Sequence, residues 1–265
     1  MEQITYTSAR TADSPQTMTN SRTLIRFNGL SNALPQLNPE LDRGALAKQY
    51  RCNGRIHIQK VLREASADRL YRCLREETTY SLSLNAGDKA CALSHLTPQQ
   101  RLECATAAWR QVGIAGFQFL FDMHLLSLNG EPYADANHYW AKVMSFLNSA
   151  EFLGFAREIT GIQGIEYADA QATHYRSGHF LTAHDDNTPG ANRLAAYVFS
   201  FTPEWRPEWG GLLEFPDSTG QVETGYLPGF NTLKLFRVPM SHYVSMVAPY
   251  ATGSRYSITG WFRAR

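Results

Sequence analysis

From about Ile165 to the C-terminus, the chain carries a series of short apolar segments at even spacing. They are rich in aromatic and β-branched residues, and Pro, Gly or Asn separates each from the next. The segments are AYVFSF, GLLEF, NTLKLFRV, HYVSMVA and SRYSITGWF. Such residues favour strands, and such separators favour tight connections between them. Short strands in series predict a β-sandwich or jelly roll and disfavour a parallel α/β sheet.

The preceding region, residues 23–164, is expected to be rich in helices. Helices are predicted in ELDRGALAKQYRCNG, SADRLYRCLREE, LTPQQRLECATAAWRQVG and SFLNSAEFLGFAREITG, and a short strand in RIHIQKVL. Thr97 with Gln100 three residues later has the pattern of a capping box, and Ser149 and Gly161 have the patterns of a helix start and stop. We expect one domain over residues 23–265, with its β core in 165–265. The polar, Ser- and Thr-rich segment 1–22 is expected to be a flexible tail.

Charge and cysteine content exclude several classes of protein. The 265 residues include 25 Lys and Arg and 24 Asp and Glu, a formal net charge of +1, without a basic run. A nucleic-acid partner is therefore not expected. The four cysteines form no C-x-x-C pair, which favours free thiols in a reducing compartment. No segment is apolar for long enough to span a bilayer or to act as a signal peptide, so we expect a cytoplasmic protein without a membrane partner.

The segment THYRSGHFLTAHDDN, residues 173–187, concentrates titratable side chains. If its second half is a strand running into a loop, His184 and Asp186 point to the same face, because side chains two apart in a strand do so. Asp185 then points away, and we expect it to anchor the following loop by capping or by an ion pair with Arg193. His-x-Asp alone is weak evidence for a metal site.

Residues further along the chain strengthen the metal hypothesis. His242 lies on a predicted strand, and Arg255 and Ser257 lie two apart on the next one. Two imidazoles and one carboxylate form the facial triad of non-heme Fe(II) oxygenases, which leaves coordination positions open. A buried guanidinium at Arg255 can grip the remote carboxylate of a 2-oxo acid with two hydrogen bonds, and Ser257 can add a third donor.

Several motifs together carry a family resemblance. They are the run from Tyr175 through Gly178 and Phe180 to His184 and Asp186, then WGGLLEF, PGFNTLKLF, HYVS and RYSITGWF. In this order they resemble the 2-oxoglutarate-dependent Fe(II) oxygenases of the prolyl 4-hydroxylase type. FLTAHDDN, GFNTLKLF and SITGWF are most similar to the catalytic domain of the ribosomal prolyl hydroxylases of yeast and animals.

The resemblance implies an α+β fold, in which a double-stranded β-helix (jelly roll) core carries N-terminal helices packed on one sheet. It implies Fe(II) held by His184, Asp186 and His242, and 2-oxoglutarate held by Arg255 with contributions from Tyr175 and Ser257. O2 is the second cosubstrate, and ascorbate is a candidate reductant. The implied reaction hydroxylates a prolyl residue in a protein or peptide and forms succinate and CO2.

Two departures leave the substrate open. Those relatives carry a second, degenerate barrel that has no counterpart after GWFR, and Ser200 stands where many members have a tyrosine that helps to hold 2-oxoglutarate. A peptide substrate predicts an open groove between the 187–193 loop and the tryptophan loop PEWRPEWGG. The alternative substrate, a free amino acid or another small molecule, predicts a closed pocket with a further buried charge.

Two other classes of function are disfavoured by the sequence. A non-catalytic module that binds or senses metal or 2-oxoglutarate is disfavoured, because all three ligands and the arginine are present. A zinc hydrolase is disfavoured, because it would need a fourth ligand or a general base.

Overall fold

The computed structural model describes residues 32–265 apart from 88–89, 129–130 and 133–137, so the predicted tail 1–22 lies outside the described residues. The helices are α1 (Arg43–Asn53), α2 (Glu64–Arg72, continued by a π-helical turn Cys73–Glu77), α3 (Pro98–Gln111), α4 (His138–Leu147) and α5 (Ala150–Thr160). The strands before residue 165 are β1 (Arg55–Gln59), β2 (Ser81–Asn85), β3 (Ala90–Leu93), β4 (Phe119–Leu125), β5 (Ser127–Leu128) and β6 (Glu131–Pro132). The later strands are β7 (Tyr167–Ala168), β8 (Gln171–Tyr175), β9 (Phe180–His184), β10 (Arg193–Phe201), β11 (Leu213–Pro216), β12 (Val222–Tyr226), β13 (Phe230–Arg237), β14 (His242–Val244) and β15 (Arg255–Arg263).

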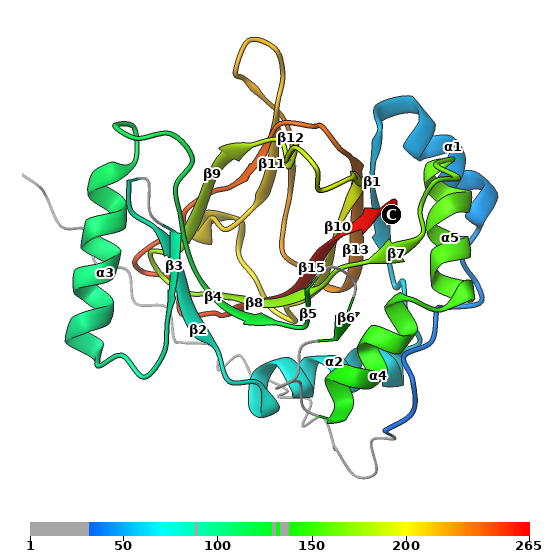
Figure 1. Ribbon diagram of the computed structural model, residues 1–265, viewed down its shortest axis with the longest axis horizontal. Coiled ribbons are helices and arrows are strands. Elements are labelled where there is room, and N and C mark those ends of the chain that lie inside the picture. The colour runs from blue at the N-terminus through cyan, green and yellow to red at the C-terminus, as the bar shows by residue number, and fades with distance from the viewer. Residues whose placement is uncertain (1–31, 88–89, 129–130, 133–137) are drawn as a thin grey trace, which may run out of the picture.

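The strands form a nearly closed antiparallel barrel, which confirms the predicted jelly roll (Figure 1). The strand order is β1-β13-β10-β15-β8-β4-β9-β14-β11-β12. Side chains join the two end strands, because Arg55 on β1 pairs with Glu223 on β12 at 2.8 Å and donates to Thr224 at 2.9 Å. The barrel is thus closed at this seam by side chains.

Four helices cover one sheet of the barrel, as expected. α1, α2, α4 and α5 pack on the outer face of β1, β13, β10, β15 and β8 (Figure 1). Alternate residues of β10 point outward into this layer, among them Tyr197 and Phe199, whereas Val198 points into the barrel. Because β10 is buried on both faces, it reads as a nearly continuous apolar run.

α3 is separate from the other helices and lies against β2 and β4 (Figure 1). Its capping box is formed as predicted: Gln100 N donates to Thr97 Oγ1, and Thr97 N donates to Gln100 Oε1. Ser149 caps α5, and Gly161 ends it in the left-handed conformation. β2, β3 and β4 were not predicted, so the region before residue 165 supplies strands of the barrel as well as helices.

No helix in the described part of the chain is both long and apolar enough to cross a membrane.

Candidate metal and cosubstrate site

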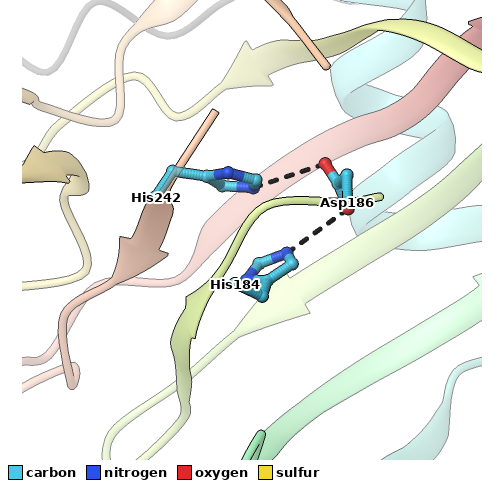
Figure 2. Close-up of side chains that lie close together, drawn as sticks. All are labelled: His184, Asp186 and His242. Atoms are coloured by element: carbon cyan, nitrogen blue, oxygen red, sulfur yellow. Dashed lines mark ion pairs between the residues drawn. The ribbon is translucent and has the colours of Figure 1, made fainter. Parts of the chain in front are cut away.

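Two histidines face each other across neighbouring strands near one end of the barrel. His184 is the last residue of β9, and its register partner on β14 is His242. Asp186 follows in the connecting segment, where its φ of 63° turns its carboxylate back toward both rings. His184 and Asp186 therefore converge through a turn and not along a straight strand, as the sequence interpretation supposed. Figure 2 shows the three side chains pointing at one another.

The ligand atoms of these residues enclose a small space. Nε2 of His184 lies 3.4 Å from Asp186 Oδ1, and Nε2 of His242 lies 3.4 Å from Oδ2. Each ring is fixed from behind, with Nδ1 2.8 Å from Met240 O in His242 and 3.0 Å from Thr182 O in His184. An Nδ1–H that donates to a carbonyl leaves the Nε2 lone pair directed at the carboxylate.

The residues fit a divalent metal ion. Burial, followed by the neighbouring His184, lowers the pKa of His242 to about 4, so this ring is neutral at pH 7. Burial would raise the pKa of Asp186, but the proximity of His184 and His242 offsets it, and the pKa lies below its ordinary value. The Nε2 lone pair of a neutral imidazole and a carboxylate oxygen are both acceptors, so facing each other they repel. A cation bound between them removes this repulsion. Metal–ligand bonds of about 2.1 Å place neighbouring ligands about 3 Å apart, close to the separations here.

Arg193 steadies the carboxylate from the outside. Its Nη1 donates to the backbone oxygen of Asp186 at 3.3 Å, and its guanidinium stacks 3.6 Å from the ring centre of Trp261. The expected ion pair between Arg193 and Asp185 is wrong, because Arg193 turns inward to Asp186. The other expected form of anchoring, capping of the loop by Asp185, is confirmed, because its carboxylate accepts from Asn187 N at 2.9 Å.

Arg255 lies inside the barrel, buried at 3 % exposure. It faces Tyr175 across the β8–β15 ladder, and its guanidinium lies 4.7 Å from the centre of that ring. Burial lowers the pKa of Arg255 and raises the pKa of Tyr175, so the phenol stays neutral. Among the described residues no partner accepts from Arg255 Nε, and no carboxylate acts on the charge. A buried cation without a counter-ion is a place for an anion.

One cavity of about 80 Å³ joins the triad to Arg255. His184, Asp186 and His242 line it together with Tyr175 and Arg255, and the rest of the wall is mostly apolar: Phe121, Leu181, Ala196, Val198, Leu213, Phe236 and Val244. Ser257 faces the same interior but does not line the cavity; it is hydrogen-bonded to Thr173 at 2.8 Å, and Thr173 does line it. The arrangement suits a ligand that chelates a metal at one end and carries a negative charge at the other.

A second hollow, of about 250 Å³, adjoins this cavity and shares Gln171 and Trp261 with it. Arg193 lines it on one side, and Arg263, paired with Asp169 at 2.5 Å, lines it on another. No role was predicted for Trp261 or Arg263 from the sequence. Their spacing from Arg255 on the same predicted strand was the available indication, because residues 255, 259 and 261 all line the barrel interior.

The tryptophan loop lies elsewhere. Trp205 packs close to Gly211, near Arg255, and Trp209 packs on Gly253. In the β10–β15 ladder this is the Ser200–Ser257 end, whereas Arg193 and Arg263 mark the other end. The groove expected between the 187–193 loop and the tryptophan loop is therefore wrong. These tryptophans close the barrel behind Arg255.

Comparisons with known proteins agree with this geometry. Residues 170–263 match the 2OG-Fe(II) oxygenase superfamily, and this span contains His184, Asp186, His242 and Arg255. The chain therefore carries a 2OG-Fe(II) oxygenase domain over these residues, and this domain supports a 2-oxoglutarate-dependent dioxygenase, an enzyme that uses Fe(II), 2-oxoglutarate and O2. No curated protein matches the sequence. The particular likeness to ribosomal prolyl hydroxylases stays a prediction.

Solved structures share the fold at low identity. A prolyl-4-hydroxylase from Pseudomonas putida is 18% identical with a TM-score of 0.53, covering 89% of this chain and 100% of that one. A prolyl hydroxylase from Trichoplax adhaerens, in complex with a peptide fragment of the hypoxia inducible factor oxygen degradation domain, is 18% identical with a TM-score of 0.54, covering 83% and 88%. A non-heme α-ketoglutarate-dependent carbocyclase from nogalamycin biosynthesis is 12% identical with a TM-score of 0.52, covering 87% of each chain.

Proposed function

We propose that this dioxygenase hydroxylates a prolyl residue in a protein or peptide, with His184, Asp186 and His242 holding the iron and Arg255 holding 2-oxoglutarate. The observation that carries these roles is the single cavity that joins the triad to a buried arginine without an acidic partner. When bound, Fe(II) supplies the activation of O2 that is coupled to decarboxylation of 2-oxoglutarate to succinate.

The protein contributes binding and orientation. His184 and His242 present Nε2 because backbone carbonyls engage Nδ1, and Arg193 holds Asp186 in its turn. The Arg255 guanidinium, which lies over the Tyr175 ring, binds the remote carboxylate of the cosubstrate. Ser257 supports this wall through Thr173. The tryptophan loop closes the barrel end behind Arg255 against water, which strengthens the electrostatic grip inside.

The hollow beside the triad supports a prolyl substrate. Trp261, covered on one face by the Arg193 guanidinium, adds an aromatic side chain to the wall of this hollow, and the 187–192 segment is largely exposed. The resemblance stated from the sequence and the names of the Pseudomonas and Trichoplax structures point to the same substrate class.

A small molecule is the second candidate substrate. Arg193 Nε is buried and has no hydrogen-bond partner in the described residues, so it could receive the carboxylate of a free amino acid. The carbocyclase from nogalamycin biosynthesis shows that this fold is not confined to prolyl hydroxylases.

The test follows succinate formation from 2-oxoglutarate after O2 is admitted to protein reconstituted with Fe(II) under anaerobic conditions. Prolyl peptides and free amino acids, including proline, are added in separate reactions, and mass spectrometry locates any added oxygen. Asp186→Ala and Arg255→Ala should abolish turnover, and Arg51→Ala, an exposed arginine on α1 outside the barrel, should not. Oxidation of free amino acids but of no peptide would reject the prolyl-peptide substrate. Full turnover in Asp186→Ala would reject the assigned metal ligands.

A further inference from the structure

A second basic side chain is buried inside the barrel besides Arg255. Among the described residues, three Lys or Arg side chains are buried: Arg69, Lys234 and Arg255. Arg69 lies on α2, outside the barrel, and pairs with Glu77 at 2.9 Å. Lys234, on β13, is 2 % exposed and forms no ion pair with a carboxylate of the described chain.

The strand register places Lys234 on the same interior face as the cosubstrate cavity. Lys234 is the register partner of Val198 on β10, and Val198 and Phe236, two residues further along β13, both line the cavity. The intervening residues Leu233 and Leu235 point outward to the helices. The Lys234 side chain therefore projects into the barrel.

Two hydroxyl groups direct the ammonium group toward the Arg255 end. Lys234 Nζ donates to Ser200 Oγ at 2.7 Å and to Thr232 Oγ1 at 3.0 Å. Ser200 is the register partner of Ser257, which is two residues from Arg255 on the same strand face. An ammonium group has three donors, so one remains for a ligand once both hydroxyls are engaged.

The charge distribution of this interior is unbalanced. Arg255 and Lys234 repel each other, and no carboxylate of the described residues lies close enough to shift the pKa of either group. Removing two like charges from water without a counter-ion is costly, and a neutral side chain of similar shape would avoid that cost. Hydroxyl groups compensate an ammonium only in part. A resident dianion or a carboxylate shared by both cations resolves the imbalance.

We propose that Lys234 is a second cation of the cosubstrate site and that it holds the remote carboxylate of 2-oxoglutarate together with Arg255. The inference rests on the proposed role of Arg255. Its consequence is selectivity: the two cations favour a 2-oxo acid with a second carboxylate over a 2-oxo monocarboxylic acid of the same chain length.

The titration of Lys234 gives an independent readout. Burial, followed by the charge of Arg255, lowers the pKa of Lys234 to about 7 in the free protein. Besides Arg255 and the triad His184, Asp186 and His242 at the other end of the cavity, the titratable groups on this face are Tyr175, which is neutral, and His57 on β1, whose pKa burial and Lys234 lower to about 4. An arriving carboxylate raises the pKa of Lys234, so binding at pH 7.5 takes up part of a proton, and neither His57 nor Tyr175 changes its charge there.

The experiment is calorimetric titration of the Mn(II)-loaded and the metal-free protein with 2-oxoglutarate and with 2-oxopentanoate, which lacks the remote carboxylate. Lys234→Met should weaken 2-oxoglutarate about 10- to 100-fold, the range for a hydrogen bond to a charged group. It should leave 2-oxopentanoate unchanged. Lys48→Met, an exposed lysine on α1, is the control and should change neither affinity. Repeating the titrations in buffers of different ionisation enthalpy should show proton uptake in the wild type and none in Lys234→Met.

Ser200→Ala is a milder variant that keeps the test decisive if Lys234→Met does not fold. It removes one of the two hydroxyls that direct the ammonium group toward Arg255, so it should weaken 2-oxoglutarate about 3- to 10-fold without affecting 2-oxopentanoate. Unchanged 2-oxoglutarate affinity in Lys234→Met, equal losses for both ligands, or equal proton uptake in wild type and variant would overturn the inference. If Arg255→Met weakens 2-oxoglutarate while Lys234→Met does not, only this inference fails. If neither variant matters and the wild type does not distinguish the ligands, the proposed cosubstrate site fails as well.

Discussion

His184 and His242 are direct partners across the β9–β14 strand pair, and their ring centres lie 4.2 Å apart. Strand pairing fixes this separation, because both histidines belong to the paired segments and each ring is fixed by a backbone carbonyl. Asp186 lies outside the pairing and depends on its turn and on Arg193. The site thus consists of a rigid pair of imidazoles and a carboxylate held by a loop.

The first prediction concerns metal binding and stability. A metal that binds only the folded protein stabilises it by about 2.7 kcal/mol when its concentration is 100 times the dissociation constant. Mn(II), used in place of Fe(II) to avoid oxidation, should therefore raise the melting temperature, and His242→Ala should remove this shift. His95→Asn is the control: His95 is exposed at a φ of 56°, which asparagine tolerates. An equal metal-dependent shift in His242→Ala would contradict the assigned ligands.

The second prediction concerns the shape of the cation at Arg255. A lysine keeps the charge but loses the planar fork and the stack over Tyr175. Arg255→Lys should raise the KM for 2-oxoglutarate by about tenfold or more, the equivalent of about 1.4 kcal/mol. Steady-state succinate assays measure this, with Arg51→Lys, an exposed arginine on α1, as the control. An unchanged KM would show that charge alone suffices at this position.

The third prediction concerns a buried carboxylate that joins α3 to the barrel. Asp122 on β4, 2 % exposed, pairs with Arg101 of α3 at 2.9 Å and with Arg176 at 2.5 Å. Breaking a buried pair leaves uncompensated charge, so Asp122→Asn should cost about 3–5 kcal/mol of unfolding free energy.

The matched control is the exposed pair of Arg43 and Glu158, at 3.2 Å. Glu158→Gln should cost about 0–1 kcal/mol, because exposed pairs contribute little. Urea unfolding measures both variants. Equal losses of unfolding free energy would mean that the ion pairs of Asp122 contribute no more than an exposed pair.

The fourth prediction separates a steric clash from backbone strain. Gly178 (φ 82°) and Gly190 (φ 77°) both have left-handed backbones, but a Cβ at Gly178 would lie 2.6 Å from Trp109 of α3, and one at Gly190 would meet nothing within 4 Å. Gly190→Ala should cost about 1–2 kcal/mol from strain alone. Gly178→Ala should cost about 1–3 kcal/mol more, because Trp109 must shift and its hydrogen bond to Gly178 O is disturbed. Thermal unfolding compares the two, and equal losses would contradict the packing of Trp109.

The sequence was sufficient to predict the β core and the three residues of the triad. The reason given for the convergence of His184 and Asp186 was incomplete. Period-two alternation pairs His184 with Asp186, but Asp186 has left the strand, and its positive φ produces the convergence. Such a turn cannot be read from residue spacing. The same turn brings Arg193 to Asp186, which explains why the predicted partner Asp185 was wrong.

Lys234 shows why a buried cation inside the barrel was not predicted from the sequence. In NTLKLF the lysine alternates with leucines, which is typical of a strand with one solvated face. In the barrel both faces of β13 are buried, so the polar positions face a closed interior. Similarly, β2 and β4 have alternating patterns, but β2 pairs with β4 and β4 pairs with β8, which are far apart in the sequence. Such long-range pairing cannot be predicted from the residues of one strand.

The last prediction concerns the acid side of the stability profile. Burial lowers the pKa of His174 to about 4, and nearby Asp122 offsets this only in part. The unfolded chain binds a proton at this residue from about pH 6.5 downward, whereas the folded chain does so only near pH 4. Stability is therefore fully present above pH 6.5 and is lost as the pH falls toward 4, by up to about 1.4 kcal/mol per pH unit for one proton.

Glutamine does not titrate, so His174→Gln removes this difference in proton binding between the folded and unfolded chains. The slope of unfolding free energy against pH should fall by the equivalent of about one proton between pH 6 and pH 4.5. A remaining slope is expected, because His57 and His179 also have pKa values lowered to about 4 by burial. Urea midpoints measured at several pH values test this, and an unchanged urea m-value shows that the fold is retained. An unchanged slope in His174→Gln would mean that the ring is already protonated in the folded protein. Its stacking on Tyr256, with ring centres 4.5 Å apart, would then be a cation–π contact.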